Sequence, residues 1–315
     1  MSNEKKQKKE EQPIPQTLKE KIMAFLKEAG IVVGLFLLIN NFVVASFLVP
    51  TGSMENEVLT GELLFVNKFI YGGTSPRNIQ QFDAIARILT LGQYGLPNVP
   101  LPWFRLPAFR DVKRGDVIVF EFPGFRNDVK PEEFQFYLKR CIGIAGDTLI
   151  IKDRVVYING QMLAIPRNIK YIMDFADPER DKTNTFPVHS GWTKDNYGPL
   201  VIPKKGMVIS LDPQNLDRWK TFIIREGHTV SSAAGAIYID GAPATSYTVQ
   251  RDYLFGMGDN RDNSLDGRYW GFIPKENLVG TPMIVYWSWN SDLALYDIFG
   301  RLASVRWGRI GSLIK

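Results

Sequence analysis

The sequence has very few of the side chains that build metal centres and cross-links. Of its 315 residues, one is a cysteine (Cys141) and two are histidines (His189 and His228). A lone cysteine excludes an intramolecular disulfide, and this small set offers no zinc site of ordinary ligand spacing. The net charge of +5 is modest, and no compact Lys/Arg cluster favours nucleic acid. We therefore expect no metal, no cofactor and no bound nucleic acid.

One long stretch lacks charge altogether. Residues 29–49 read AGIVVGLFLLINNFVVASFLV. About 20 apolar helical residues cross the ~30 Å hydrocarbon layer of a bilayer, so this stretch is long enough to span it. The apolar part of a cleavable secretory signal is usually only about 7–15 residues long. We predict an uncleaved transmembrane helix over residues 22–49, preceded by a disordered charged tail over residues 1–21.

The placement of lysine predicts the orientation of this single-pass anchor. Lys19, Lys21 and Lys27 precede the apolar stretch closely, whereas the first cation after it is Lys68. Positive residues stay on the cytoplasmic side of a membrane segment. We therefore expect a cytoplasmic N-terminus, and residues 50–315 on the extracytoplasmic side of a cell membrane.

The rest of the chain reads as one mostly β domain. Strands are predicted where β-branched and aromatic residues lie between Gly, Pro, Asn and Asp. These stretches are 63–70, 116–122, 148–160, 207–211, 236–241 and 281–289. The polar Lys152-Asp153-Arg154 predicts a hairpin turn inside 148–160, and no strong helical pattern occurs outside the anchor. Residues 72–111 and 161–200 are irregular and are interpreted as insertions on the β scaffold.

Two short motifs carry candidate chemistry. Pro50-Thr51-Gly52-Ser53-Met54 follows the anchor directly, so Ser53 lies close enough to the membrane to meet a substrate embedded in it. In YLKRCIGIAGD (137–147), Lys139 and Arg140 interrupt an apolar strand and point to opposite faces, so one of them must face the interior or a cleft. Burial lowers a lysine pKa by as much as ~3–5 units, which makes a usable base.

A third motif, GDNRDNSLDGRYWG (258–271), resembles the start of a calcium-binding loop. That interpretation fails because Ile273 stands where a bidentate Glu is required and no helices flank the loop. The residue types suit a hydrogen-bonded loop that orders a site instead.

Together and in this order, the three motifs resemble the three diagnostic boxes of bacterial type I signal peptidases. The resemblance implies a Ser/Lys serine protease with a mostly β catalytic domain, acting on the signal peptides of secretory preproteins at a lipid bilayer. Ser53 matches the nucleophile and Lys139 the general base. The backbone N–H of Ser53 and the hydroxyl of Thr51 match the oxyanion hole.

The resemblance also implies roles for supporting residues. Ser264 matches a hydroxyl that hydrogen-bonds the lysine, and Asp266 and Arg268 match a structural ion pair. Residues that match walls of the pockets for small side chains at −1 and −3 are Met54, Val58 and Leu138.

The sequence departs from the family pattern at Thr51, where Ser is frequent, at Asn56, where Pro is frequent, and at Gly267, where Ser is usual. One alternative stays open at this point: a non-catalytic, membrane-anchored β-domain that binds a partner.

Overall fold

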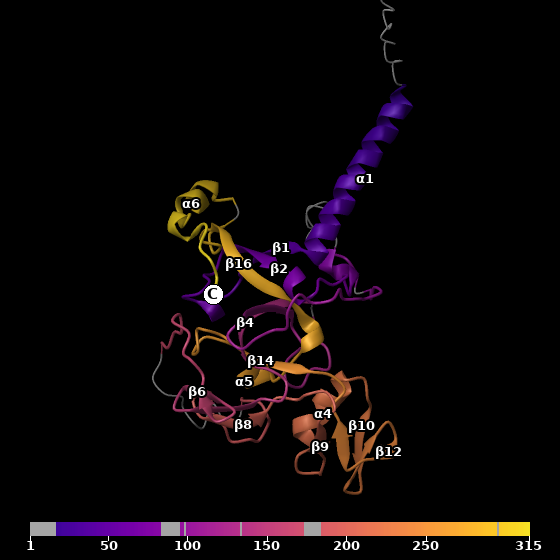
Figure 1. The fold of residues 1–315 in the computed structure, drawn as a ribbon, viewed down its shortest axis with the longest axis vertical. Helices are drawn as coiled ribbons and strands as arrows, with labels where there is room; N and C mark the ends of the chain where they lie inside the picture. The colour runs from indigo at the N-terminus through magenta and orange to yellow at the C-terminus, as the bar shows by residue number, and fades with distance from the viewer. Residues whose placement is uncertain (1–16, 83–94, 98, 133, 173–183, 295) are drawn as a thin grey trace, which may run out of the picture.

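The computed structural model of the chain describes residues 17–82, 95–97, 99–132, 134–172, 184–294 and 296–315. One long helix stands away from a body of four antiparallel sheets (Figure 1). The predicted mostly β fold with one N-terminal apolar helix is confirmed. The predicted disordered tail falls mainly on residues 1–16, which lie outside the described residues. Its last part was predicted wrongly, because residues 18–21 already belong to the helix that was expected to begin at residue 22.

The long helix α1 (Leu18–Phe42) begins with a reciprocal cap. The Thr17 hydroxyl accepts a hydrogen bond from the Glu20 backbone N–H, and the Glu20 carboxylate accepts one from the Thr17 N–H. This capping box satisfies N–H groups that a helix start leaves unpaired. Among the described residues, α1 is the one helix long and apolar enough to cross a membrane, and its apolar part is not buried against the body.

The predicted end of this helix at Val49 is wrong. The helix stops at Phe42, and β1 (Val44–Leu48) follows, paired antiparallel with β2 (Glu62–Asn67). Hydrophobicity alone does not distinguish a helix end from a buried strand, and the β-branched residues beyond Phe42 favour the strand once β2 offers a partner. The uncharged part of the helix, residues 29–42, is therefore only about 21 Å long.

The main sheet has seven strands in the order β1-β2-β16-β3-β4-β14-β15. Its other members are β16 (Leu278–Ser288), β3 (Val117–Glu121), β4 (Phe136–Gly143), β14 (Tyr253–Met257) and β15 (Ile273–Pro274). Every neighbouring pair is antiparallel. β4 lies between β3 and β14, so segments far apart in the sequence meet around the strand that carries Lys139.

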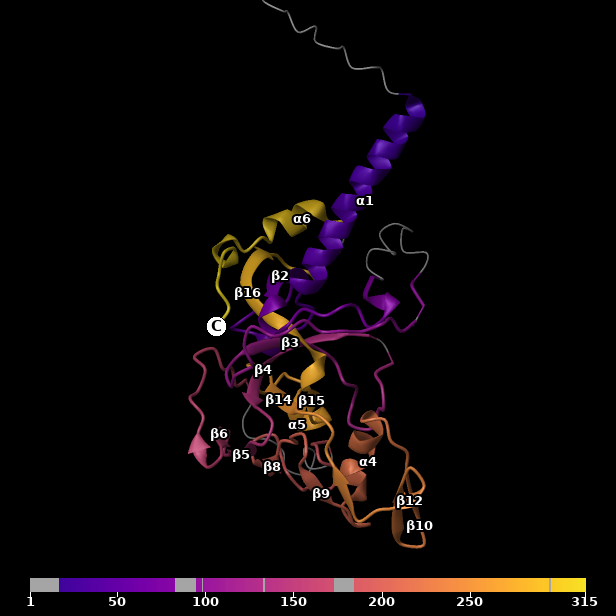
Figure 2. The ribbon, with the colours of Figure 1, turned by 45° about the vertical axis from the view of Figure 1, so that its right-hand side comes forward.

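Three smaller sheets complete the body on the side away from α1 (Figure 2). One contains β7 (Gln161–Met162), β6 (Val155–Ile158), β5 (Thr148–Lys152) and β8 (Tyr197–Val201). Another pairs β9 (Val208–Ser210) with β13 (Ser246–Thr248), and the third contains β10 (Val230–Ala233), β11 (Ala236–Ile239) and β12 (Ala242–Pro243). The predicted hairpin is confirmed: β5 and β6 pair around Asp153 and Arg154, whose φ angles are 48° and 71°.

The expectation of no strong helical pattern outside the anchor is wrong at α4 (Leu216–Arg225). This helix buries Leu216, Phe222 and Ile223 on one face, while Asp217 and Lys220 are exposed. Its ten residues are too few for the pattern to stand out from the flanking loops. The other helical elements among the described residues are α5 (Gly267–Trp270), α6 (Ile298–Ala303), η1 (Gly52–Met54), η2 (Phe69–Tyr71), η3 (Ile79–Phe82), η4 (Lys275–Asn277) and η5 (Trp307–Arg309).

The two segments interpreted as insertions are partly described; residues 83–94, 98 and 173–183 lie outside the described residues. In the first, isolated bridges join Thr74 to Arg105 and Asn78 to Pro100. The ring of Phe104 stacks on Phe42 at the end of α1, with centroids 5.6 Å apart. The second is not wholly irregular, because it supplies β7 and most of β8.

Candidate active site

Ser53 and Lys139 meet although 86 residues separate them. Ser53 lies in η1, just after β1, and Lys139 lies on β4 opposite Ile118 of β3. The Nζ atom of Lys139 donates a hydrogen bond to Oγ of Ser53 at 2.6 Å. The structure therefore brings together the serine and the lysine that the sequence singled out.

The lysine is almost completely enclosed, with 3% of its surface exposed. This burial lowers the pKa of Lys139 from 10.5 to about 8, against the opposing effect of the Asp266 carboxylate and together with a contribution from the Arg268 guanidinium. At pH 7 a lysine with a pKa of about 8 is neutral in roughly one molecule in ten, compared with about 0.03% for an ordinary lysine. An uncharged amine can accept a proton.

Lys139 is not the only cation that β4 places inside the protein. The sequence predicted that either Lys139 or Arg140 faces inward, and both do. Arg140 donates two hydrogen bonds to the carboxylate of Asp259, at 2.8 and 2.6 Å, and lies 3.6 Å from Glu57. Sequence reasoning missed this pair. A second cation in an apolar strand needs a buried anion as its partner. The acidic residues of the third motif, which include Asp259, were the signal in the sequence that could have identified this partner.

The loop 258–263 packs directly against the serine turn. The backbone N–H of Asn260 donates to the carbonyl of Ser53 at 3.1 Å, and its side-chain amide donates to the carbonyl of Gly52 at 3.1 Å. At Gly258, a Cβ atom would lie 2.4 Å from the Ser53 carbonyl oxygen and 2.2 Å from the Ser264 hydroxyl. The close approach of loop and turn therefore requires glycine at this position.

Asp266 and Arg268 form the ion pair that the resemblance implied. Arg268 donates to both carboxylate oxygens of Asp266 at 2.9 Å, and both side chains are buried. Asp266 also accepts a hydrogen bond from the Gly258 N–H at 3.0 Å. Burial alone would raise the pKa of Asp266, but Arg268 and these hydrogen bonds hold it below its usual value. The pair thus holds the start of the loop at Gly258, and Arg268 also donates to the carbonyl of Arg261 at 2.7 Å.

Ser264 lies beside the site but does not make its expected contact. Its hydroxyl is buried and has no hydrogen-bond partner among the described residues. The expected bond to Lys139 is therefore absent; the amine of Lys139 donates to Ser53.

A pocket of about 670 Å³ opens beside the two side chains. Its walls are mainly apolar. They consist of Phe47, Leu48, Val49, Pro50, Thr51, Ser53, Met54, Leu64, Val119, Gln135, Phe136, Tyr137, Leu138, Lys139, Asn263 and Leu265. Met54 and Leu138, which the resemblance assigned to pocket walls, line this pocket, and so does Thr51, whose hydroxyl the resemblance assigned to the oxyanion hole. Val58 does not: it is fully buried in the core cluster behind Met54 and is not part of the wall.

Two departures from the family pattern have structural correlates. Asn56 has a φ of 83°, which proline cannot adopt and asparagine tolerates. At Gly267, a Cβ atom would lie 2.9 Å from the carbonyl oxygen of Gly256 and 3.0 Å from the ring of Phe255. The side chain of a serine here would require its neighbours to shift.

The described residues contain no group of three or more His, Cys, Asp and Glu side chains that could hold a metal ion. Cys141 is buried beside the site on β4, and burial raises the pKa of its thiol.

Comparisons with known proteins identify the family of the chain. A sequence model of the family described as "Signal peptidase, peptidase S26" matches residues 22–287. Signal peptidase I of Rickettsia rickettsii is 28% identical over 292 residues, which cover 89% of this chain and 88% of the relative. Signal peptidase I of Helicobacter pylori is 26% identical over 273 residues, covering 80% and 78%.

Among solved structures, a signal peptidase I from Enterococcus faecalis matches 55% of this chain and 97% of its own, with 20% identity and a TM-score of 0.27. The family match, which spans most of the sequence and all three motifs, shows that this chain belongs to the signal peptidase family, peptidase S26.

Proposed function

We propose that this chain is a membrane-anchored serine endopeptidase that removes N-terminal signal peptides from exported preproteins. The observation that carries the proposal is the 2.6 Å contact between Lys139 and Ser53 at the edge of an apolar pocket. Family membership gives no support to the alternative of a non-catalytic binding protein.

In the proposed mechanism Ser53 is the nucleophile and Lys139 the general base. The neutral amine of Lys139 accepts the hydroxyl proton as Oγ attacks the scissile carbonyl. The N–H of Ser53 and the hydroxyl of Thr51 stabilise the negative charge of the tetrahedral intermediate. Lys139 then gives its proton to the leaving amine, and water activated by the same lysine hydrolyses the acyl-enzyme.

The pocket next to Ser53 supports a preference for small side chains at −1 and −3. Met54 and Leu138 contribute apolar surface close to the dyad, and large rings of Phe136 and Tyr137 occupy space along the wall. A peptide bound as an extended strand places alternate side chains on the same side, which suits recognition of −1 and −3 together.

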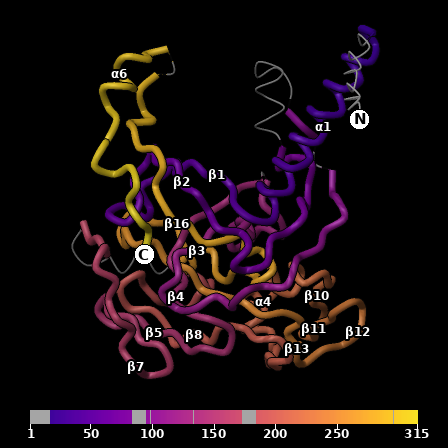
Figure 3. Tube along the Cα trace, turned by 45° about the horizontal axis from the view of Figure 1, so that its top comes forward, coloured from indigo at the N-terminus to yellow at the C-terminus, as the bar shows by residue number. Residues whose placement is uncertain are grey.

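We further propose that the N-terminus is cytoplasmic and that the body lies against the outer face of the membrane. The uncharged part of α1 is about 21 Å long, which is shorter than the ~30 Å hydrocarbon layer, so the body must approach the bilayer closely. The segment around α6 rises on the same side of the body as α1 (Figures 1 and 3). It exposes Tyr296, Phe299 and Trp307, and aromatic residues are favoured at membrane interfaces.

The proposal is tested by incubating the detergent-solubilised chain with a purified preprotein and sequencing the N-terminus of the product. We expect a single new N-terminus directly after the −1 residue. A chain that leaves the preprotein intact, or cuts within the mature part, would contradict the proposal.

A further inference from the structure

The position of Ser53 depends on contacts that come from outside its own turn. Asn260 binds the Ser53 and Gly52 carbonyl oxygens through its backbone and side-chain amides. Asn260 therefore holds the serine turn in place, and we call it the template of this turn. Contacts that fix Asn260 also fix the nucleophile.

A segment of the second insertion runs along the outer side of this template. The N–H of Lys170 donates to the Asp259 carbonyl at 2.8 Å, and the Arg261 N–H donates to the Lys170 carbonyl at 2.9 Å. These bonds form a parallel bridge between Lys170 and Asn260. The Lys170 amine also lies 2.9 Å from the carboxylate of Glu55, which belongs to the serine turn. The segment thus contacts both the loop and the turn.

The far end of this segment is held through Asp262. One oxygen of its carboxylate accepts a hydrogen bond from the Ile172 N–H at 2.7 Å, and the other forms an ion pair with the amine of Lys194. Both charged side chains are enclosed: that of Asp262 is 0% exposed and that of Lys194 is 9% exposed. A buried carboxylate that loses its cation is strongly destabilised in that position.

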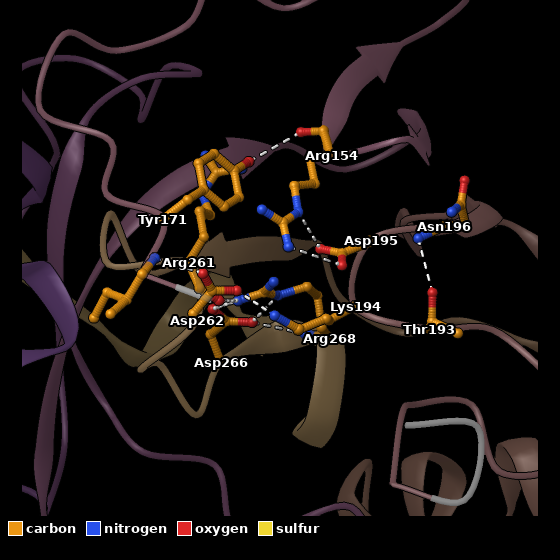
Figure 4. A network of polar contacts seen from close by, with 11 residues as sticks. Arg154, Tyr171, Thr193, Lys194, Asp195, Asn196, Arg261, Asp262, Asp266 and Arg268 are labelled. Carbon is orange, nitrogen blue, oxygen red and sulfur yellow. Dashed lines mark hydrogen bonds and ion pairs between the residues drawn. The ribbon is translucent and has the colours of Figure 1, made fainter. Parts of the chain in front are cut away.

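The backbone around Lys194 is itself fixed, as Figure 4 shows. Thr193 and Asn196 close a tight turn, in which the N–H of Asn196 donates to the Thr193 hydroxyl at 3.0 Å. Asp195 accepts a hydrogen bond from Arg154 at 3.2 Å, and the Tyr171 hydroxyl donates to the Arg154 carbonyl at 3.1 Å. Lys194 therefore approaches Asp262 from a rigid part of the insertion.

We propose that Lys194 is a positioning residue for the Ser53–Lys139 pair. It acts through Asp262, which keeps residues 170–172 paired with the loop 258–263. This pairing keeps Asn260 in hydrogen-bond contact with the Ser53 carbonyl. The inference rests on the proposed function and adds a role for the insertion 161–200: it is part of the mechanism that aligns the nucleophile. Lys194 does not touch the reacting atoms, so its replacement changes the turnover rate more than it changes substrate binding.

The test compares Lys194→Met with Lys68→Met in the full chain in detergent. Lys68 is a matched control because it is also a buried lysine, but its amine donates to the Asn40 carbonyl at the end of α1. We expect kcat to fall roughly 10- to 100-fold for Lys194→Met while KM changes less than threefold, because small misplacements of reacting groups have effects of this size. Lys68→Met should keep the wild-type kcat, and Lys194→Arg should recover most of the lost rate.

The double variant Lys194→Met/Asp262→Asn guards against a folding defect, because it removes the buried charge together with its partner. It should show a reduced kcat. Its fold-loss in kcat should be smaller than the product of the fold-losses measured for Lys194→Met and for Asp262→Asn separately. A folded single or double variant with wild-type kcat would overturn the inference, and so would an equal loss in Lys68→Met. A wild-type chain that cleaves no preprotein would instead overturn the proposed function.

Discussion

The pH dependence of cleavage follows directly from the burial of Lys139. With a pKa of about 8, the neutral fraction of this lysine rises about 50-fold between pH 6 and pH 8 and only about twofold between pH 8 and pH 9.5. For a lysine at 10.5, the second interval alone would bring a rise of about 30-fold. The interval from pH 8 to 9.5 therefore separates a buried base from an exposed one.

The assay is kcat/KM for one preprotein, measured in detergent at constant ionic strength, because this parameter reports the ionisation of the free enzyme. Lys68 is the essential control, since burial lowers its pKa to about 8 as well. Lys68→Met should leave the profile unchanged, and EDTA should not affect it. A 30-fold rise in kcat/KM between pH 8 and 9.5 would refute the claim that burial lowers the pKa of the base. If Lys68→Met abolished the rise in kcat/KM below pH 8, the titrating group would be Lys68 and not Lys139.

Three further predictions concern stability, specificity and the membrane. Because the folded pKa of Lys139 lies below its unfolded value, its burial costs stability at and below pH 8, and this cost disappears as the pH rises from about 8 to 10.5. The pKa shift corresponds to about 3 kcal/mol at pH 7, so Lys139→Met should raise the unfolding free energy by about 2 kcal/mol at pH 7 and not at pH 10.5, after allowing about 1 kcal/mol for the lost hydrogen bond to Ser53. Equal shifts in thermal unfolding at both pH values would contradict this. Preproteins with Ala, Ser, Leu or Phe at −1 should be cleaved quickly only with Ala or Ser, since a large side chain overpacks the wall formed by Met54 and Leu138; processing of Phe as fast as Ala would show the pocket assignment to be wrong. In liposomes, brominated lipids should quench the fluorescence of Trp307, which is obtained by subtracting the fluorescence of Trp307→Phe from that of the full chain. If this Trp307 fluorescence is the same with and without brominated lipids, the α6 side of the body lies away from the bilayer.

Much of the site could be predicted from sequence because its three motifs carry distinctive residues. The serine, the lysine and the Asp266–Arg268 pair all lie close together in the structure. What composition could not show was which contacts each polar group makes. Ser264 was expected to bind the lysine, but its hydroxyl has no partner among the described residues. The pairing of Arg140 with Asp259 was not predicted, because the two residues are 119 positions apart in the sequence.

The boundaries of elements were harder to predict than their existence. The anchor was expected to run to Val49, yet residues 44–48 pair with β2, because a strand partner outweighs the helical preference of an apolar run. Helix α4 was missed because its pattern is short. The role of the second insertion was also hidden, since Lys194 and Asp262 are 68 residues apart and only the fold brings them together.

The most direct test of the account is single-turnover cleavage of one preprotein by Ser53→Ala and by Lys139→Met at pH 9, beside the wild-type chain. Nucleophile and base act as one unit, so each substitution should remove as much activity as both together. We predict that mass spectrometry detects the mature product only with the wild-type chain. Product with the correct N-terminus from the Ser53→Ala variant would contradict the claim that Ser53 is the nucleophile.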